Sequence, residues 1–305
     1  MFSGSLVAIV TPFLADGGLD LPAWGRLLDF HAASGTSGIV IGGTTGESAT
    51  LEIPELLQLL QQARARLGGR LPLIAGIGTS STATTVERAL QLSAAGADAL
   101  LVVTPAYNRP TQEGLYRHFE AVAQAASVPV ILYNVPSRTA VDLLPATVAR
   151  LAKLPRIVAV KEAVNSLERI RELIAVTGAS ARDSGFAVLS GDDATAGEAM
   201  LSGFRGVVSV TANAAPRAMA DLASAALRGD RAAVARIDAS LAPLHQALFV
   251  EANPIPVKWA VEQLGLVGPT LRLPLTRLSE VRQPEVREAL QIAGAVSAPA
   301  QARQA

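Results

Sequence analysis

The segment Ala99-Leu-Leu-Val-Val103 is followed by an amphipathic stretch, Glu113–Ala126, and then by a second apolar segment, Val130-Ile-Leu-Tyr133. Both apolar segments are near-continuous and rich in Val, Ile and Leu, which is typical of parallel strands buried on both faces. Between them, apolar residues recur with helical spacing. A strand, a helix and a second strand in this order indicate an α/β fold.

The same alternation continues along most of the chain. The further apolar runs are Leu6–Val10, Ile39–Ile41, Leu73–Ala75, Ile157–Val160, Phe186–Leu189 and Gly206–Val210. Helical patterns include Ile53–Leu67, Thr85–Ala95 and Leu167–Val176, and Thr84 with Glu87 predicts a capping box at the start of the second. Eight such units favour a closed (β/α)8 TIM barrel over an open doubly wound sheet.

The end of the chain has a different character. From Pro216 onward it is rich in alanine and helical in spacing, with no further strand-like run. We therefore expect a catalytic barrel in residues 1–228, a small C-terminal helical extension in residues 229–294 and a disordered tail in residues 295–305.

The composition excludes several classes of protein. Of 305 residues, 50% are hydrophobic and 17% are charged, which is not the composition of a disordered chain. The net charge is zero and aromatic residues are 4%, so we expect no nucleic-acid partner. The chain has no cysteine, and its histidines, His31, His118 and His245, are far apart, so we expect no metal site. No basic leader and no membrane-length apolar run is present, so we expect a cytoplasmic protein without a membrane partner.

Lysine is rare in this chain. Among 26 basic residues only Lys153, Lys161 and Lys258 are lysines. Lys161 ends an apolar run, and barrel active sites lie where strands end. An apolar barrel disfavours the ammonium form, and a neutral amine can form a Schiff base with a carbonyl, which arginine cannot do. The alternative is a lysine that pairs with a carboxylate or extends to the rim.

Other polar residues follow the predicted strands. Tyr133 and Tyr107 could transfer protons to and from a Schiff base, or could be ordinary rim aromatics. The turn Gly42-Gly-Thr-Thr-Gly-Glu47 exposes amides and hydroxyls that suit a small anion, although glycine turns are also common connectors. Arg138 could bind a carboxylate or be solvated, and Gly191-Asp-Asp193 predicts a helix N-cap.

With their surroundings, these residues closely resemble the dihydrodipicolinate synthase family, a branch of the pyruvate-dependent class I aldolases that also include N-acetylneuraminate lyase. The resemblance covers nearly the whole chain apart from Ala179–Gly185 and the tail. Its stretches are Phe2–Pro12, Gly42–Thr50, Tyr107–Tyr116, Tyr133–Thr139, Val160–Glu162, Leu189–Asp193, Val208–Asn213 and Asn253–Trp259.

The resemblance implies a reaction. Lys161 would form an imine with pyruvate, and the derived enamine would attack L-aspartate-4-semialdehyde to give 4-hydroxy-tetrahydrodipicolinate, the first committed step of the diaminopimelate route to lysine. Tyr133 would transfer the proton, and Thr44 would link it to Tyr107 of a neighbouring subunit. The implied substrate-binding residues are Thr45, Arg138, Gly191 and Val208. The resemblance further implies a homotetramer, built as a dimer of dimers, that needs no metal or organic cofactor.

Two other functions remain open at this point. One is an aldolase of the same superfamily that acts on a 2-keto-3-deoxy sugar acid, from which Arg138 within Pro-Ser-Arg-Thr distinguishes this branch. The other is an inert barrel that binds pyruvate-like ligands, against which the intact set of Lys161, Tyr133, Thr44 and Tyr107 argues. A metal-dependent aldolase is disfavoured by the scattered histidines.

The resemblance is weaker at the site where feedback-inhibited members bind lysine. A buried ammonium without a carboxylate partner is costly, so the loss of a glutamate at position 84 matters most. We therefore expect weak or absent inhibition by lysine. Ser48 and Ala49 match that site, whereas Ile53, Leu56, Ser80, Thr84 and Ala106 replace its two histidines, asparagine, glutamate and tyrosine.

Overall fold

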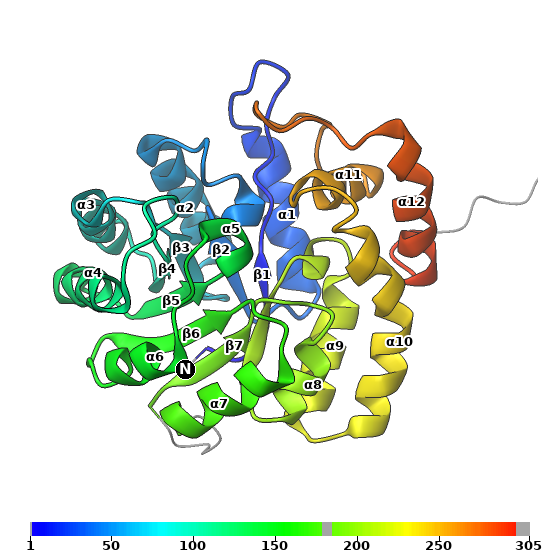
Figure 1. Cartoon of the computed structure of the whole chain (residues 1–305). Coiled ribbons are helices and arrows are strands. Elements are labelled where there is room, and N and C mark those ends of the chain that lie inside the picture. Colours follow the sequence, from blue (N-terminus) through cyan, green and yellow to red (C-terminus); the bar gives the residue numbers. More distant parts are fainter. Residues whose placement is uncertain (1, 179–184, 297–305) are drawn as a thin grey trace, which may run out of the picture.

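A computed structural model describes residues 2–178 and 185–296. Eight parallel strands form a closed barrel in the order β1 to β8, and β1 pairs with β8 to close it (Figure 1). The predicted (β/α)8 barrel is therefore confirmed. The strands are β1 Gly4–Ala8, β2 Gly38–Ile41, β3 Leu73–Gly76, β4 Ala99–Val103, β5 Val130–Asn134, β6 Ile157–Glu162, β7 Ala187–Ser190 and β8 Gly206–Ser209.

Helices surround the barrel, and α10 and α12 extend the chain beyond it on one side (Figure 1). α10 packs on α9 and α12, and α11 packs on α12. No helix in the two described ranges could cross a membrane. The helices are α1 Leu21–Ala33, α2 Ile53–Leu67, α3 Thr82–Ala94, α4 Gln112–Ala125, α5 Pro136–Thr139, α6 Pro145–Leu151, α7 Leu167–Thr177, α8 Ala196–Leu201, α9 Pro216–Leu227, α10 Arg231–Ala247, α11 Ile255–Gln263 and α12 Gln283–Ile292, with 3-10 turns η1 Thr44–Gly46, η2 Thr211–Asn213 and η3 Glu280–Arg282.

The strands separate two apolar layers, because successive side chains point to opposite faces. The outer layer lies between the strands and the helices. The inner layer lies inside the barrel and is built from alanines, larger aliphatic side chains and Tyr133. Ala159 belongs to this inner layer, and the pleat therefore directs Lys161, two residues later, into the barrel.

The start of α3 differs from the sequence-based expectation in two ways, its first residue and its N-cap. α2 has the predicted bounds, but α3 begins at Thr82 rather than Thr85. The prediction of a capping box at Thr84 and Glu87 is wrong, because the N-cap is Ser81, whose extended backbone lets its Oγ accept a hydrogen bond from the Thr84 N–H at 3.3 Å.

The prediction that Gly191-Asp-Asp193 caps a helix is also wrong. α8 starts later, with Thr195 as its N-cap residue. Asp193 instead accepts hydrogen bonds from the N–H groups of Val210 and Thr211, each at 2.8 Å. This carboxylate therefore satisfies backbone donors just after β8.

Of the tail expected in residues 295–305, only Ala295 and Val296 belong to the described part of the chain; residues 297–305 lie outside it.

Candidate active site

The carboxyl ends of β5 and β6 bring Tyr133 and Lys161 together. The two residues are partners in the parallel ladder. Lys161 Nζ lies 4.1 Å from the centroid of the Tyr133 ring, and Lys161 and Tyr133 are 5% and 7% exposed. No carboxylate in the described ranges forms an ion pair with Lys161. The buried amine therefore faces an aromatic ring and not an acid, which disagrees with the alternative of a paired structural lysine.

Gly191 makes room for the lysine side chain. A Cβ atom at this position would lie 2.9 Å from Lys161 Cε and 3.1 Å from Ala163 Cβ. The Gly191 N–H donates to the Glu162 carbonyl at 2.7 Å, which fixes the loop after β7 against β6. Val208 is buried in the inner layer of the barrel, in the cluster that also contains Tyr133. Gly191 thus lies beside the lysine, and Val208 lies in the apolar interior of the same barrel.

The glycine-rich turn after β2 carries Thr44 and Thr45 in the 3-10 turn η1. A Cβ atom at Gly46 would lie 3.0 Å from the Ile9 carbonyl oxygen, so a larger residue would force the turn away from the segment after β1 by a few tenths of an ångström. Thr45 is buried, and its Oγ1 accepts a hydrogen bond from Asn253 Nδ2 at 3.0 Å. The turn therefore contacts both the segment after β1 and the C-terminal segment.

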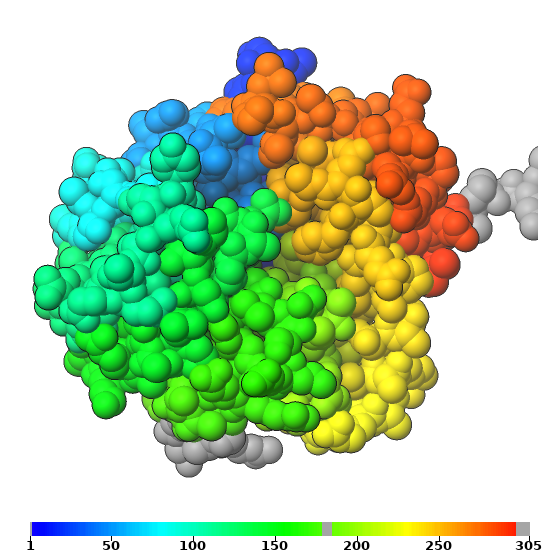
Figure 2. Space-filling model, in the orientation of Figure 1, coloured from blue at the N-terminus to red at the C-terminus, as the bar shows by residue number. Residues whose placement is uncertain are grey.

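Thr44 and Tyr133 line one crevice at the mouth of the barrel. Its free volume is about 30 Å³, and backbone of Gly42, Gly43 and Gly78 completes part of its wall. Figure 2 shows this face of the molecule hollowed between the blue N-terminal part, the green middle part and the orange C-terminal part. The arrangement offers a hydroxyl pair next to a buried amine.

Two predicted site residues lie farther out. Arg138, on α5, is exposed at the mouth and donates from Nη2 to the Asn253 carbonyl at 3.1 Å. Tyr107 is 94% exposed, has a left-handed backbone with φ of 73°, and is not among the residues that line the crevice of its own chain. The single chain therefore brings Lys161, Tyr133 and Thr44 to the mouth of the barrel but leaves Tyr107 outside.

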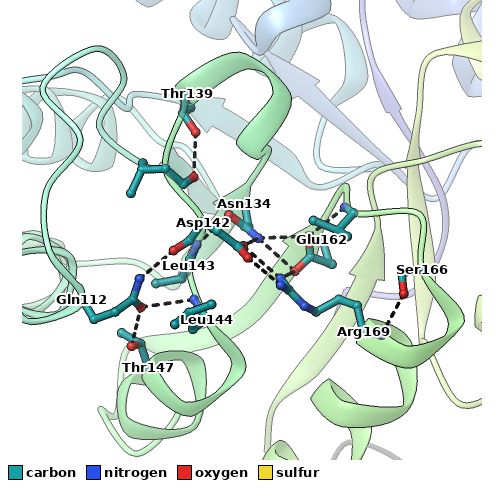
Figure 3. Close-up of polar contacts among 12 residues, drawn as sticks. Gln112, Asn134, Thr139, Asp142, Leu143, Leu144, Thr147, Glu162, Ser166 and Arg169 are labelled. Carbon is teal, nitrogen blue, oxygen red and sulfur yellow. Dashed lines mark hydrogen bonds and ion pairs between the residues drawn. The ribbon is translucent and has the colours of Figure 1, made fainter.

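A polar network that sequence reasoning missed fixes β5 and β6 from outside the barrel (Figure 3). Asn134 Nδ2 donates to Glu162 Oε1 at 3.1 Å and to Asp142 Oδ1 at 2.8 Å. Arg169 forms ion pairs with Asp142 at 2.6 Å and with Glu162 at 3.1 Å. Burial raises the pKa of Glu162, although its hydrogen bonds and Arg169 oppose the shift. Asn134 and Glu162 are the residues that follow Tyr133 and Lys161, so the network holds the side chains of Tyr133 and Lys161 at one level.

A second missed cluster joins the threonine turn to the C-terminal segment. Glu47, which ends η1 with a left-handed φ of 58°, forms an ion pair with Lys258, and each side chain is 1% exposed. The Arg272 N–H donates to Glu47 Oε2 at 3.0 Å, and Lys258 Nζ lies 4.2 Å from the centroid of the Phe13 ring. Burial lowers the pKa of Lys258 to about 8, although Glu47 opposes the shift. The rarity of lysine in this chain was the one sequence signal for this cluster.

The histidines are buried separately and each meets a threonine. Their Nδ1 atoms lie within hydrogen-bond distance of Thr36, Thr82 and Thr211, respectively. Burial lowers the pKa of both His31 and His118 to about 4. Within residues 2–178 and 185–296, no three His, Asp or Glu side chains gather as metal ligands would.

Known proteins are similar to this chain in sequence and in fold over almost its full length. The Dihydrodipicolinate synthetase family matches residues 1–293. The 4-hydroxy-tetrahydrodipicolinate synthase of Pseudomonas aeruginosa is 51% identical over 97% of this chain and 100% of that protein, and the one of Thioalkalivibrio sulfidiphilus is 53% identical over 96% of this chain and 98% of that protein.

Solved structures agree with these sequence matches. The chloride-inhibited dihydrodipicolinate synthase of Acinetobacter baumannii, complexed with pyruvate, is 45% identical with a TM-score of 0.94, over 97% of this chain and 100% of that chain. A structure described as the first monomeric dihydrodipicolinate synthase variant is 40% identical with a TM-score of 0.93, over 97% of this chain and 98% of that chain. With the matched family, these similarities show that the chain belongs to the dihydrodipicolinate synthetase family.

Proposed function

We propose that Lys161 is the nucleophile with which this chain condenses pyruvate and L-aspartate-4-semialdehyde to give 4-hydroxy-tetrahydrodipicolinate. The chain is a lyase, and the relatives reported above are 4-hydroxy-tetrahydrodipicolinate synthases. The observation that carries the assignment is the buried Lys161 amine, which lies over Tyr133 without an acidic partner in the described ranges and beside a glycine that leaves it room.

In the proposed reaction the Lys161 amine attacks the ketone carbon of pyruvate, and the ketone oxygen leaves as water, which gives an imine. Loss of a proton from the methyl carbon gives an enamine, and this carbon forms the new bond to the aldehyde carbon of the semialdehyde. The amino group of the semialdehyde then displaces the lysine by transimination and closes the ring. Tyr133 supplies and accepts the protons, with Thr44 and Tyr107 as the relay.

Substrate binding is assigned to the surrounding groups. Thr45 and the amides of its turn would bind the pyruvate carboxylate, and Gly191 and Val208 would line the pocket. Arg138 would bind the carboxylate of the semialdehyde, because its guanidinium donates to a single carbonyl in the described part of the chain and keeps further N–H groups for a ligand.

Trapping the imine tests the proposal. We expect that incubation with pyruvate followed by borohydride adds a pyruvyl group to the peptide that contains Lys161, and that omission of pyruvate abolishes the adduct. Peptides with Lys153 and Lys258 serve as internal controls. Labelling at either of these, or no labelling of the folded protein, would contradict the mechanism.

The remaining assignments concern assembly and regulation. We propose a cytoplasmic homotetramer, a dimer of dimers that needs no cofactor, in which the exposed Tyr107 reaches a neighbouring active site. Within each chain, residues 1–228 would form the barrel and residues 229–294 the extension. We expect at most weak inhibition by lysine, because Thr84 is exposed and offers no carboxylate and Leu56 is buried. Half-maximal inhibition at sub-millimolar lysine would refute this.

A further inference from the structure

Arg138, the proposed ligand of the second substrate, stands on a very short helix. α5 has four residues, and an isolated helical turn is unstable in water. It ends at Ala140, whose φ of 58° lies in the left-handed region that alanine adopts at an energetic cost. Such a conformation persists only where the surroundings impose it. The orientation of Arg138 therefore depends on contacts that hold α5 in place.

Thr139, the residue after Arg138, makes one such contact. Thr139 is 3% exposed, whereas its neighbours Arg138 and Ala140 are exposed to water. Its Oγ1 accepts a hydrogen bond from Thr104 Oγ1 at 3.1 Å and lies 3.0 Å from the Val141 carbonyl, to which it can donate. One hydroxyl can do both, because it has one hydrogen and two lone pairs. Thr139 thus joins α5 to the residue that follows β4 and to its own loop.

Thr104 gives Thr139 a firm support. It directly follows β4, it is fully buried, and its N–H donates to the Tyr133 carbonyl at 2.9 Å, so its backbone is bonded to β5. The loop after α5 is held as well, because Asp142 accepts a hydrogen bond from Asn134 at 2.8 Å (Figure 3). α5 is therefore tied to the barrel through the threonine pair, Thr104 and Thr139, and through the loop that follows it.

The tip of the Arg138 side chain has a contact of its own. Its Nη2 donates to the Asn253 carbonyl at 3.1 Å, so α5 fixes the base of the side chain and Asn253 contacts its end. A long side chain that is already oriented loses less rotamer freedom when it binds a carboxylate. A shift of α5 would therefore weaken this binding although the guanidinium is still present.

We propose that Thr104 and Thr139 are positioning residues for Arg138. Their buried hydroxyl pair holds α5 so that the guanidinium is oriented for the carboxylate of L-aspartate-4-semialdehyde before this substrate arrives. The role rests on the proposed function, in which Arg138 binds that carboxylate. Imine formation between Lys161 and pyruvate precedes this step and does not use Arg138, so loss of the hydroxyl pair should affect the second substrate only.

Removing the Thr139 hydroxyl tests the role. Thr139→Val keeps the branched shape but leaves the buried Thr104 hydroxyl without its acceptor, which is unfavourable, so α5 should shift. We expect kcat/KM for the semialdehyde to fall about tenfold, the effect of one lost hydrogen bond. The rate of borohydride trapping with pyruvate should change by less than about twofold, and Thr139→Ser should restore most of the loss. An unchanged kcat/KM for the semialdehyde, or an equal loss in trapping, would overturn the proposal.

A double-mutant cycle separates positioning from a general structural role. If Thr139 acts through Arg138, adding Thr139→Val to Arg138→Met should cause no further loss of kcat/KM for the semialdehyde. A loss that persists in full in the Arg138→Met background would overturn the proposal. Thr36→Val is the matched control, because Thr36 is a buried threonine before β2, at the other end of the strands, and its hydroxyl lies 3.1 Å from His31 Nδ1. An equal effect of this control on the semialdehyde would also contradict the proposal.

Crystal structures of the variants decide the positioning without reference to activity. We expect the contact between Arg138 Nη2 and the Asn253 carbonyl to be present in the wild type and in Thr139→Ser and lost in Thr139→Val; its retention in Thr139→Val would overturn the proposal. If Thr139→Val does not fold, Thr104→Val gives the same test and leaves the Thr139 hydroxyl able to donate to the Val141 carbonyl. A wild-type enzyme that does not condense pyruvate with the semialdehyde would refute the proposed function, and the crystals would still show whether the threonine pair orients Arg138.

Discussion

Replacing Lys258 with methionine tests whether the C-terminal segment holds the threonine turn in place. Lys258 lies on α11 and Glu47 ends the turn that carries Thr44 and Thr45, so the ion pair joins parts of the chain that are 211 residues apart. Methionine removes the ammonium group but can keep the apolar contact with Phe13. The variant leaves the Glu47 carboxylate buried, with the Arg272 N–H as its remaining donor among the contacts described above.

The size of the effect follows from this burial. Removing one partner of a buried ion pair costs about 3–5 kcal/mol, because the other charge stays desolvated. For a chain of 305 residues, the usual unfolding entropy per residue converts this loss into a fall of about 5–8 °C in Tm. Because the displaced turn carries Thr44 and Thr45, the KM for pyruvate should rise more than kcat falls.

Thermal unfolding at one protein concentration and pH 7 is the assay, with Lys153→Met as the matched control. Lys153 is exposed, so the same substitution there should change stability by no more than about 0.5 kcal/mol. The double variant Glu47→Gln with Lys258→Met should be more stable than the sum of the single effects predicts, because it leaves no unpaired charge.

The reasoning would be refuted by a Lys258→Met variant that unfolds within about 1 °C of the wild type, or by single effects that add without coupling. An unchanged KM for pyruvate in a clearly destabilised variant would limit the pair to a role in stability.

Three further predictions follow from contacts around the site. In Gly191→Ala, the new methyl group lies 2.9 Å from Lys161 Cε, so turnover should fall about 10²-fold and borohydride trapping should fall with it; normal trapping would contradict this. Asn253→Ala removes the hydrogen bond to Thr45, and the KM for pyruvate should rise about fivefold, as measured by initial rates. Burial lowers the pKa of His31 to about 4 in the folded protein, below the ordinary imidazole value of about 6.5, so the unfolded state binds more protons and stability falls with acidification. Between pH 7.5 and 4.5, urea unfolding should show a loss of about 2.5 kcal/mol that His31→Gln lacks.

The strands could be predicted from sequence because their signals are local. Each is a short apolar run, and most observed bounds fall within one or two residues of the prediction. Lys161 and Tyr133 could be selected for the same reason, since each stands at or near the end of such a run and all parallel strands end at one mouth of the barrel.

The contacts that hold the site could not be predicted, because they depend on how distant loops approach each other. Glu47 and Arg272 are 225 residues apart, and no local pattern in either segment indicates that the two come into contact. Asp193 shows the same difficulty. Its position before a helical pattern predicts a cap, but the three-dimensional structure places two backbone N–H groups of the segment after β8 within its reach.

The pleat of β6 separates two neighbouring charges in a way that the proposed chemistry at Lys161 requires. Lys161 points into the barrel, and Glu162, the next residue, points outward to Asn134 and Arg169. A carboxylate beside the amine would stabilise its ammonium form, which cannot attack a carbonyl. Arg169 gives Glu162 a cationic partner outside the barrel, so the carboxylate is satisfied without Lys161. We infer that the network in Figure 3 serves the reaction by keeping the acid on the far side of the strand as well as by fixing the strand itself.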